Sequence, residues 1–402
     1  MKSAVMNNAS LNRSNWAAVF GLSLTAFVLV ASEFMPVSLL TPIAGELNIS
    51  EGQAGQAIAI SGGFALITSL FITSLAGMLN RKTLLLSLTL LMIVSGTVVT
   101  FAPNYFIFMM GRALIGIAIG GFWSMSAAIA MRLVSDDQIP RALAIVNGGN
   151  ALATVIAAPL GSYLGGIIGW RGAFFFIVPV AAIAFVWLFL KLPKLKAVTG
   201  SHSGNILKLL KEPPVAFGMA AASFFFMGQF TLFTYLRPFL ETITKAGVTS
   251  ISFILLVLGL AGLLGTIVIG NLLKNRLYRT LIVIPLLMSL IAIGLIEFGH
   301  SMIATTVLLG LWGLLATSAP VAWWTWVAKA LPKDAEAGGG LMVALVQLSI
   351  MLGAVVGGLL YDVRGYQATF AMSVIFLLAS ASFGVVTARI QAGLTQAKVV
   401  AN

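Results

Sequence analysis

Long apolar stretches separated by short polar segments run along the whole chain. A helix needs about 20 apolar residues to cross the hydrocarbon core of a bilayer. Twelve stretches of roughly that length can be marked, at 16–40, 54–78, 83–101, 105–130, 142–166, 172–190, 214–236, 249–272, 279–298, 302–328, 338–360 and 368–389. The pattern therefore predicts an all-α membrane protein with twelve transmembrane helices.

The composition excludes several other classes of protein. Hydrophobic residues make up 59% of the chain and charged residues 8%, whereas about a quarter of the residues of a soluble domain are charged. There is no cysteine and there are only two histidines, His202 and His300, so we expect no disulfide and no metal centre. The net charge of +12 comes from short basic segments between apolar stretches, which favours membrane topology over nucleic-acid binding.

The basic residues also predict the orientation in the membrane. Twelve spans place both termini on one side. With the termini in the cytosol, 18 of the 23 lysines and arginines fall in inner segments. Only Arg171, Arg237, Lys245 and Arg364 fall in outer loops, and Arg112 lies inside a span. Because cytosolic loops carry the excess of basic residues, cytosolic termini are predicted.

An internal repeat divides the chain into two related halves. A shift of 196 residues lays Gly161–Phe174 on Gly357–Phe370, and it places Gly169 on Gly365. Parallel repeats of this kind are the plan of a large transporter class whose solute site lies between the halves. We therefore predict two pseudo-symmetric six-helix bundles, with the boundaries 1–192 for the first bundle, 193–213 for a cytosolic linker that includes a short amphipathic helix at Ile206–Leu210, and 214–402 for the second bundle.

Two charged residues lie well inside the predicted spans, Glu33 and Arg112. Each costs roughly 2.5–3.5 kcal/mol at a helix centre, so such residues normally have a partner or a task. On the predicted topology both lie in the outer half of the membrane, where an ion pair or a water-bridged pair is possible. One interpretation is structural, with Arg112 binding main-chain carbonyls and Glu33 as a fixed counter-ion. The other makes Glu33 the proton carrier of a transport cycle.

Aromatic and amide side chains inside the spans are candidates for contact with a solute. The repeat lays Glu33 on Gln229, so the two halves present a carboxylate and a carboxamide at related places. Core packing and helix–helix hydrogen bonding are the competing interpretation of these residues, and Trp326 is assigned to the interfacial belt. The candidates are Phe122, Trp123, Asn147, Asn150, Phe226, Gln229, Phe230, Tyr235, Trp312 and Gln347.

Glycines indicate packing rather than nucleotide binding. Gly116 and Gly120, like Gly353 and Gly357, are four residues apart, a spacing that lets helices approach closely. The chain has no Gly-x-x-x-x-Gly-Lys motif, so we expect an ion or solute gradient, rather than ATP, to drive transport. A channel and a membrane enzyme are the alternatives from other classes. The sequence favours neither, since it has no oligomeric pore signature and no nucleophile–base set in the spans.

Three segments resemble those of the major facilitator superfamily, and within it the twelve-span drug:proton antiporters. They are Arg112–Gly116, Ala158–Gly161 and Gly77–Lys82, the last without the aspartate that this loop usually carries. The resemblance covers essentially the whole chain. It implies the major facilitator fold, proton-coupled antiport with Arg112 linked to the coupling, and no bound cofactor.

Four further segments are similar to those of bacterial purine ribonucleoside efflux permeases: Glu33–Pro42, Gly120–Ser126, Gly228–Pro238 and Val346–Leu348. This resemblance implies export of inosine- or guanosine-like solutes in exchange for protons, by a monomer in the bacterial cytoplasmic (inner) membrane. Stacking aromatics and amide side chains suit a neutral purine nucleoside. A multidrug or a sugar exporter on the same scaffold is the alternative.

Overall fold

The computed structural model describes residues 2–75, 79–135, 138–195, 206–331 and 335–401, and within these ranges it contains helices and no β-strand. Ten helical segments in these ranges are long and apolar enough to cross a membrane, and two of them, Val248–Gly270 and Arg276–Phe298, belong to one interrupted helix. The prediction of an all-α membrane protein is therefore confirmed. The count of twelve spans remains a prediction.

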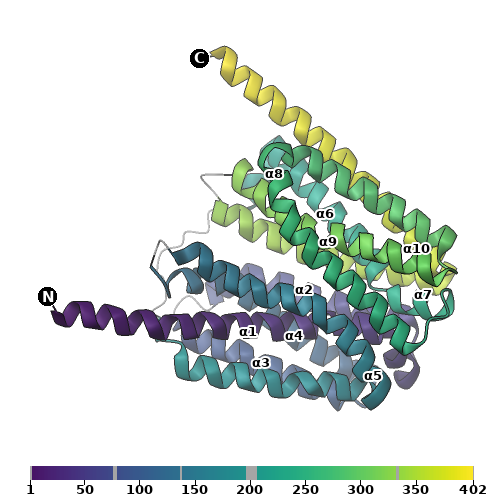
Figure 1. Ribbon diagram of the computed structural model, residues 1–402, viewed down its shortest axis with the longest axis horizontal. Coiled ribbons are helices and arrows are strands. Elements are labelled where there is room, and N and C mark those ends of the chain that lie inside the picture. The colour runs from purple at the N-terminus through teal and green to yellow at the C-terminus, as the bar shows by residue number, and fades with distance from the viewer. Residues whose placement is uncertain (1, 76–78, 136–137, 196–205, 332–334, 402) are drawn as a thin grey trace. The chain divides into compact units, whose positions relative to one another are not determined.

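The helices fall within a few residues of most of the predicted spans (Figure 1). Residues 76–78 of the second predicted span and 196–205 of the predicted linker lie outside the described residues. The linker's predicted short helix is present, as a 3₁₀-helix. The elements are α1 (Lys2–Leu47), α2 (Glu51–Leu75), α3 (Arg81–Thr100), α4 (Tyr105–Met131), α5 (Ile139–Lys191), η2 (Ile206–Lys211), α6 (Pro213–Phe233), α7 (Leu236–Thr242), α8 (Val248–Phe298), α9 (Met302–Ala330) and α10 (Ala335–Ala401).

The chain forms two compact units. The first contains Met1–Pro42 and Ile60–Ser201, and the second contains Ile43–Ala59 and His202–Asn402. The end of α1 and the beginning of α2 therefore belong with the second unit, although the rest of both helices belongs with the first. The sequence-based boundaries at 192 and 214 stay a prediction.

Three helices are interrupted by a residue with non-helical backbone angles. In α5 it is Gly169 (φ 74°, ψ 164°), and in α10 it is Gly365 (φ 73°, ψ −169°). In α8 it is Arg276 (φ −133°, ψ 29°). The apolar parts of α5 and α10 are 51 and 56 residues long, more than twice the roughly 20 residues that one crossing needs.

The two glycine breaks occupy equivalent places in the repeat. Gly169 and Gly365 are the pair that the 196-residue shift superimposes, and their φ angles differ by one degree. A φ near +75° combined with a ψ near 180° is a conformation that essentially only glycine adopts. The sequence repeat therefore corresponds to a repeated backbone conformation.

Small residues hold the helices of each unit close together. In the first unit, Gly116 and Gly120 lie against the main chain of Ser61 and Ala65 on α2, with no room for a Cβ atom. In the second unit, Gly353 packs against α6 in the same way, while the Ser373 hydroxyl donates to the Gly228 carbonyl at 2.6 Å. The predicted packing role of these glycines is confirmed.

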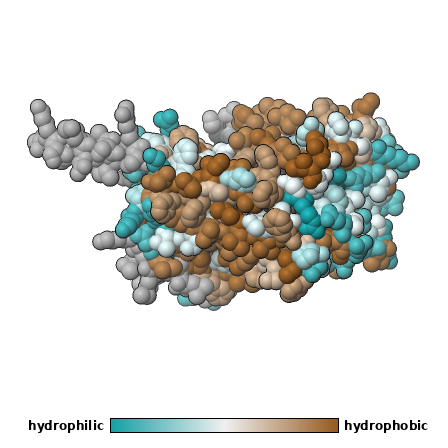
Figure 2. Space-filling view, turned by 90° about the horizontal axis from the view of Figure 1, so that it is seen from below, coloured by the Kyte–Doolittle hydropathy of each residue, from teal (hydrophilic) through white to brown (hydrophobic). Residues whose placement is uncertain are grey.

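Large apolar side chains remain exposed on the outside of the helices. Ile303 is 79% exposed, Val363 78% and Phe106 71%, and Figure 2 shows apolar residues over much of the face that it displays. Soluble proteins rarely expose large contiguous apolar patches. Lipid acyl chains are the solvent that suits this surface.

We predict that Gly169→Ala and Gly365→Ala each destabilise the protein by about 1–3 kcal/mol, the usual cost of a strained backbone conformation. Among the described residues, no atom lies within 4 Å of the place that a Cβ atom would occupy at either glycine, so only the backbone angles oppose the substitution. Thermal unfolding in detergent measures the effect. Gly148→Ala, in the helical part of α5 and equally open, is the control and should be neutral or stabilising. Equal melting temperatures for all three variants would contradict the prediction.

Candidate functional site

Arg112 on α4 is the fully buried centre of a polar cluster in the first unit, with an exposed fraction of 0%. Its Nη1 donates to the main-chain carbonyl of Ser32 at 2.7 Å. Its Nη2 donates to the main-chain carbonyl of Glu33 at 3.0 Å and to the hydroxyl of Ser61 at 3.1 Å. A single guanidinium group thus joins α4 to α1 and α2.

Glu33 lies beside this guanidinium group and is itself 5% exposed. The two residues interact electrostatically, so they are neighbours, as their predicted depths suggested. The hydrogen bonds from Arg112 to main-chain carbonyls agree with the structural interpretation, in which the arginine binds the main chain. The role of Glu33 as a proton carrier stays a prediction.

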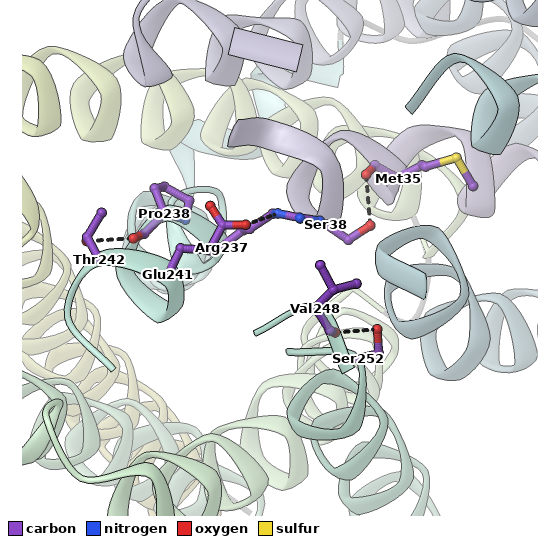
Figure 3. A network of polar contacts seen from close by, with 8 residues as sticks. All are labelled: Met35, Ser38, Arg237, Pro238, Glu241, Thr242, Val248 and Ser252. Atoms are coloured by element: carbon purple, nitrogen blue, oxygen red, sulfur yellow. Dashed lines mark hydrogen bonds and ion pairs between the residues drawn. The ribbon is translucent and has the colours of Figure 1, made fainter. Parts of the chain in front are cut away.

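Proline and serine residues shape α1 just beyond Glu33. Pro36 and Pro42 lie inside the helix, and each removes a main-chain hydrogen-bond donor. The Ser38 hydroxyl donates to the Met35 carbonyl at 3.0 Å (Figure 3). Gly161, from the segment that resembles the antiporter motif, lies so close that a Cβ atom would be 2.6 Å from the Ser38 hydroxyl. A larger residue where α5 passes α1 would require the Ser38 side chain to shift.

The other candidates of the first unit differ in their surroundings. Phe122 is 1% exposed and packs edge-to-face on the half-buried Trp123, with ring centroids 5.4 Å apart. Asn147 is exposed, and its amide donates to the Leu143 carbonyl at 3.0 Å. Asn150 is half-buried. Phe122 is thus a core residue, whereas Trp123 and Asn150 keep part of their surface accessible.

Tyr235 in the second unit has a clear packing role. It is fully buried, its hydroxyl donates to the Ala354 carbonyl at 2.7 Å, and its ring stacks on Tyr361 at 5.4 Å. Gly55 and Gly358 leave space for its hydroxyl end. These contacts satisfy the side chain, and they match the packing interpretation of this candidate.

The aromatic candidates on α6 pack against neighbours on the same helix. Phe226 is 6% exposed and meets Phe225 edge-to-face at 5.3 Å. Phe230 is 5% exposed and meets Phe233 in the same geometry at 6.1 Å. These contacts match the packing interpretation of both candidates.

Three candidates of the second unit carry a buried polar atom that has no hydrogen-bond partner among the described residues. They are the Oε1 atoms of Gln229 on α6 and Gln347 on α10, and the Nε1 atom of Trp312 on α9. Trp312 is 1% exposed and Gln347 6%. An unsatisfied buried polar atom costs about 1–3 kcal/mol, so each such atom needs an explanation. A bound polar solute that donates to the amide oxygens and accepts from the indole would supply one.

Arg237, which was predicted to lie in an outer loop, lies in the short helix α7 that follows α6, and it is 5% exposed. Its Nε donates to the Glu241 carboxylate at 2.7 Å (Figure 3). The two residues are one helical turn apart, so the buried guanidinium group has a nearby counter-ion. The position of Arg237 relative to the membrane stays a prediction.

The assignment of Trp326 to an interfacial belt was wrong. Trp326 is 1% exposed and packs edge-to-face on Trp323 at 6.0 Å. A Cβ atom at Gly218 would overlap its ring, so the glycine makes room for the indole. Trp326 was assigned to the membrane–water interface because it lies near the end of a predicted span. It is buried instead because Gly218 leaves space for its ring.

The sequence analysis missed a capping arrangement at the beginning of α2. The Ser50 main-chain N–H donates to Gln53 Oε1 and the Gln53 main-chain N–H donates to Ser50 Oγ, both at 3.0 Å. Asp362 accepts from Ser50 Oγ at 2.6 Å and from the Gly52 main-chain N–H at 2.9 Å. The Ser-x-x-Gln spacing is a signal for such a capping box. The contribution of Asp362, 310 residues further on, has no local signal.

The described part of the chain offers no cluster of metal ligands. No three His, Cys, Asp or Glu side chains come together among the residues that the structure describes. The polar groups that do gather are a guanidinium with carbonyls and hydroxyls in one unit, and amide and indole groups in the other. The first set can stabilise a neighbouring carboxylate, and the second can bind a neutral polar solute.

Comparisons with known proteins agree on the family. The sequence profile of the Major Facilitator Superfamily matches residues 22–339. The chain is 59% identical over 382 residues to the "Transcription regulatory protein OpdE" of Pseudomonas aeruginosa, covering 94% of this chain and 95% of that protein. It is 38% identical over 369 residues to the "Purine ribonucleoside efflux pump NepI" of Salmonella enteritidis, covering 92% and 93%.

The fold is also that of a solved transporter. A bacterial homolog to the human lysosomal transporter Spinster, crystallised in an inward-facing and unoccupied conformation, matches with a TM-score of 0.74. The sequence identity is 14%, and the match covers 94% of this chain and 97% of that one. At this identity the likeness concerns the fold alone.

We predict that Arg112→Lys lowers the melting temperature, although it keeps the positive charge. A lysine ammonium lacks the planar fork with which arginine reaches two carbonyls and a hydroxyl at once, and each buried acceptor left unpaired costs about 1–3 kcal/mol. Ser162→Ala is the matched control, because Ser162 is also 0% exposed but its hydroxyl has no partner among the described residues. Thermal unfolding in detergent should show a large loss for the first variant and little change for the second. The same melting temperature for Arg112→Lys and the parent protein would refute the prediction.

Proposed function

This chain belongs to the major facilitator superfamily of transporters, and we propose that it is a proton-coupled antiporter that exports purine ribonucleosides such as inosine or guanosine. It is a multi-pass membrane transporter rather than an enzyme. In the proposal, α5, α8 and α10 each cross the membrane twice, with breaks at Gly169, Arg276 and Gly365. Together with single crossings by α1, α2, α3, α4, α6 and α9 this makes twelve spans and two six-helix bundles, with both termini in the cytosol.

The observation that carries the solute proposal is the set of unsatisfied polar atoms on apolar helices. The side-chain oxygens of Gln229 and Gln347 and the indole N–H of Trp312 are buried without partners in the described structure. A hypoxanthine or guanine base has ring N–H donors and carbonyl or ring-nitrogen acceptors, and its ribose has hydroxyls. These groups pair with amides and an indole without any charge.

The identity of the solute is also supported by relatives. The chain is 38–39% identical to several Salmonella proteins named as purine ribonucleoside efflux pumps, over nine-tenths of its length. A hydrophobic site that binds a base by hydrogen bonds rejects analogues that leave its polar groups unpaired. We therefore favour nucleosides over cationic drugs and over sugars, which remain the alternative solutes on this scaffold.

Proton coupling is proposed for Glu33, with Arg112 as its partner. Burial favours the neutral form of a carboxyl group, whereas a nearby arginine favours the charged form. A conformational change that alters the exposure of Glu33, or its distance from Arg112, changes this balance. The carboxyl group then takes up a proton in one state and releases it in the other. The transmembrane proton gradient is the energy source, and no cofactor is involved.

The name of the Pseudomonas aeruginosa relative refers to transcription, which a transporter can influence without binding DNA. An exporter that lowers the cytosolic concentration of a small effector changes the occupancy of any regulator that binds this effector. A chain with 59% hydrophobic residues and ten membrane-length helical segments in its described part suits this indirect route. We propose that any regulatory effect of this chain follows from transport.

Transport of labelled inosine into proteoliposomes tests the proposal. With the lumen acidic, an antiporter drives saturable inosine accumulation as protons leave, and a protonophore abolishes it. Guanosine should compete, whereas arabinose and a cationic dye should not. Saturable transport of arabinose or the dye, with no inosine transport, would overturn the nucleoside assignment.

The Glu33→Gln variant separates coupling from binding. It should lose gradient-driven accumulation but keep inosine counterflow, because the amide cannot exchange a proton while the solute contacts remain. Glu46→Gln, at an exposed position of the same helix, should behave as the parent protein. Undiminished gradient-driven accumulation by Glu33→Gln would show that the carrier is another group.

A further inference from the structure

A groove on the surface of the second unit has an apolar wall and a basic end. It encloses about 350 Å³ between the two parts of α8 and α9. This volume is within the range of small-ligand sites, roughly 300–1,000 Å³. The apolar wall includes Leu264, Val268, Leu272, Val283, Leu287 and Leu314, which are 36–59% exposed.

Two arginines, Arg276 and Arg279, lie at one end of the groove. Both are exposed, and in the described part of the chain neither has an acidic partner. Arg276 is the non-helical residue that separates the two parts of α8, and its carbonyl accepts a hydrogen bond from Thr280, which also lines the groove, at 2.9 Å. The interruption of α8 at Arg276 thus places two guanidinium groups and a hydroxyl at the end of the groove.

Close packing holds one wall of the groove against α9. Gly265 lies against the main chain of Leu314, with no room for a Cβ atom. The Thr266 hydroxyl donates to the Gly262 and Thr317 carbonyls at 3.0 and 3.3 Å. The first part of α8 is therefore held directly on α9, and the second part closes the other side.

The length of the groove matches one leaflet of a bilayer. Leu264 precedes Arg276 by 12 residues, which is about 18 Å along a helix. Half of the hydrocarbon core is about 15 Å thick. With the arginines at the membrane surface, the apolar wall reaches the middle of the membrane. A lipid acyl chain lying beside the protein covers this depth.

We propose that this groove binds an anionic phospholipid, whose phosphate is held by Arg276 and Arg279 and whose acyl chain lies along the wall formed by the two parts of α8 and α9. Guanidinium groups bind phosphate through paired hydrogen bonds, and basic pockets between membrane helices on the cytosolic side attract acidic headgroups. On the predicted topology these arginines face the cytosol. The inference depends on the membrane location of the chain and is independent of its solute.

Native mass spectrometry of the purified full-length protein with dioleoyl phosphatidylglycerol or dioleoyl phosphatidylcholine tests the site. The double variant Arg276→Gln with Arg279→Gln should bind phosphatidylglycerol at least about tenfold more weakly, because hydrogen bonds to charged groups are strong. Its binding of phosphatidylcholine should change little. Arg389→Gln, which removes an exposed arginine of α10 outside the groove, is the matched control and should keep the affinity.

Two further variants keep the test decisive. Replacement of both arginines by lysine should restore part of the phosphatidylglycerol affinity, which a misfolded protein would not do. Val268→Trp with Val283→Trp should fill the groove and reduce lipid retention while both arginines remain. Phosphatidylglycerol affinity within twofold of the parent protein in the double glutamine variant would overturn the proposal. So would an equal loss in Arg389→Gln, or unchanged lipid retention in the tryptophan variant.

Discussion

The buried guanidinium group of Arg112 is the interaction on which the first unit depends. A charge inside apolar helices is tolerated only where polar groups surround it. Here the carbonyls of Ser32 and Glu33 and the hydroxyl of Ser61 do so. Because these acceptors come from α1 and α2, the charge fixes the position of Glu33 and joins three helices. Any movement of the main chain at Glu33 has to change contacts of this guanidinium group.

The buried charge of the first unit and the buried amide and indole groups of the second differ in their partners. In the first unit the guanidinium group of Arg112 has hydrogen-bond acceptors. In the second, the amide oxygens of Gln229 and Gln347 and the indole N–H of Trp312 have no hydrogen-bond partner among the described residues. A buried charge with hydrogen-bond partners stabilises helix packing and can influence the protonation of a neighbouring carboxyl group. Neutral groups without partners can bind a solute that supplies the missing hydrogen bonds. The assignment of coupling to Glu33 and Arg112, and of solute binding to the amide and indole groups, rests on this difference.

Most of the fold was predictable because a bilayer imposes simple rules on a sequence. The lengths of apolar segments predicted the helices, and the sequence repeat alone pairs Gly169 with Gly365, the two residues that share a glycine-specific backbone conformation. The lengths of apolar segments do not predict which side chains contact one another. Burial of Trp326 depends on the space left by Gly218, and the buried Arg237 pairs with Glu241, one helical turn away. The similar predicted depth of Glu33 and Arg112 in the membrane indicated that they are neighbours. The main-chain carbonyls that accept from Arg112 have no signal in the sequence and are seen only in the structure.

In the proposed antiport cycle, Glu33 carries its proton in one state and the solute binds in the other, so binding of inosine should displace the proton. Proton release on addition of inosine to the purified protein in lightly buffered detergent solution tests it most directly. Our account predicts acidification that saturates with inosine in the parent protein, and inosine binding without proton release in Glu33→Gln. Equal proton release from both proteins, or inosine binding to the parent protein without any release, would contradict it.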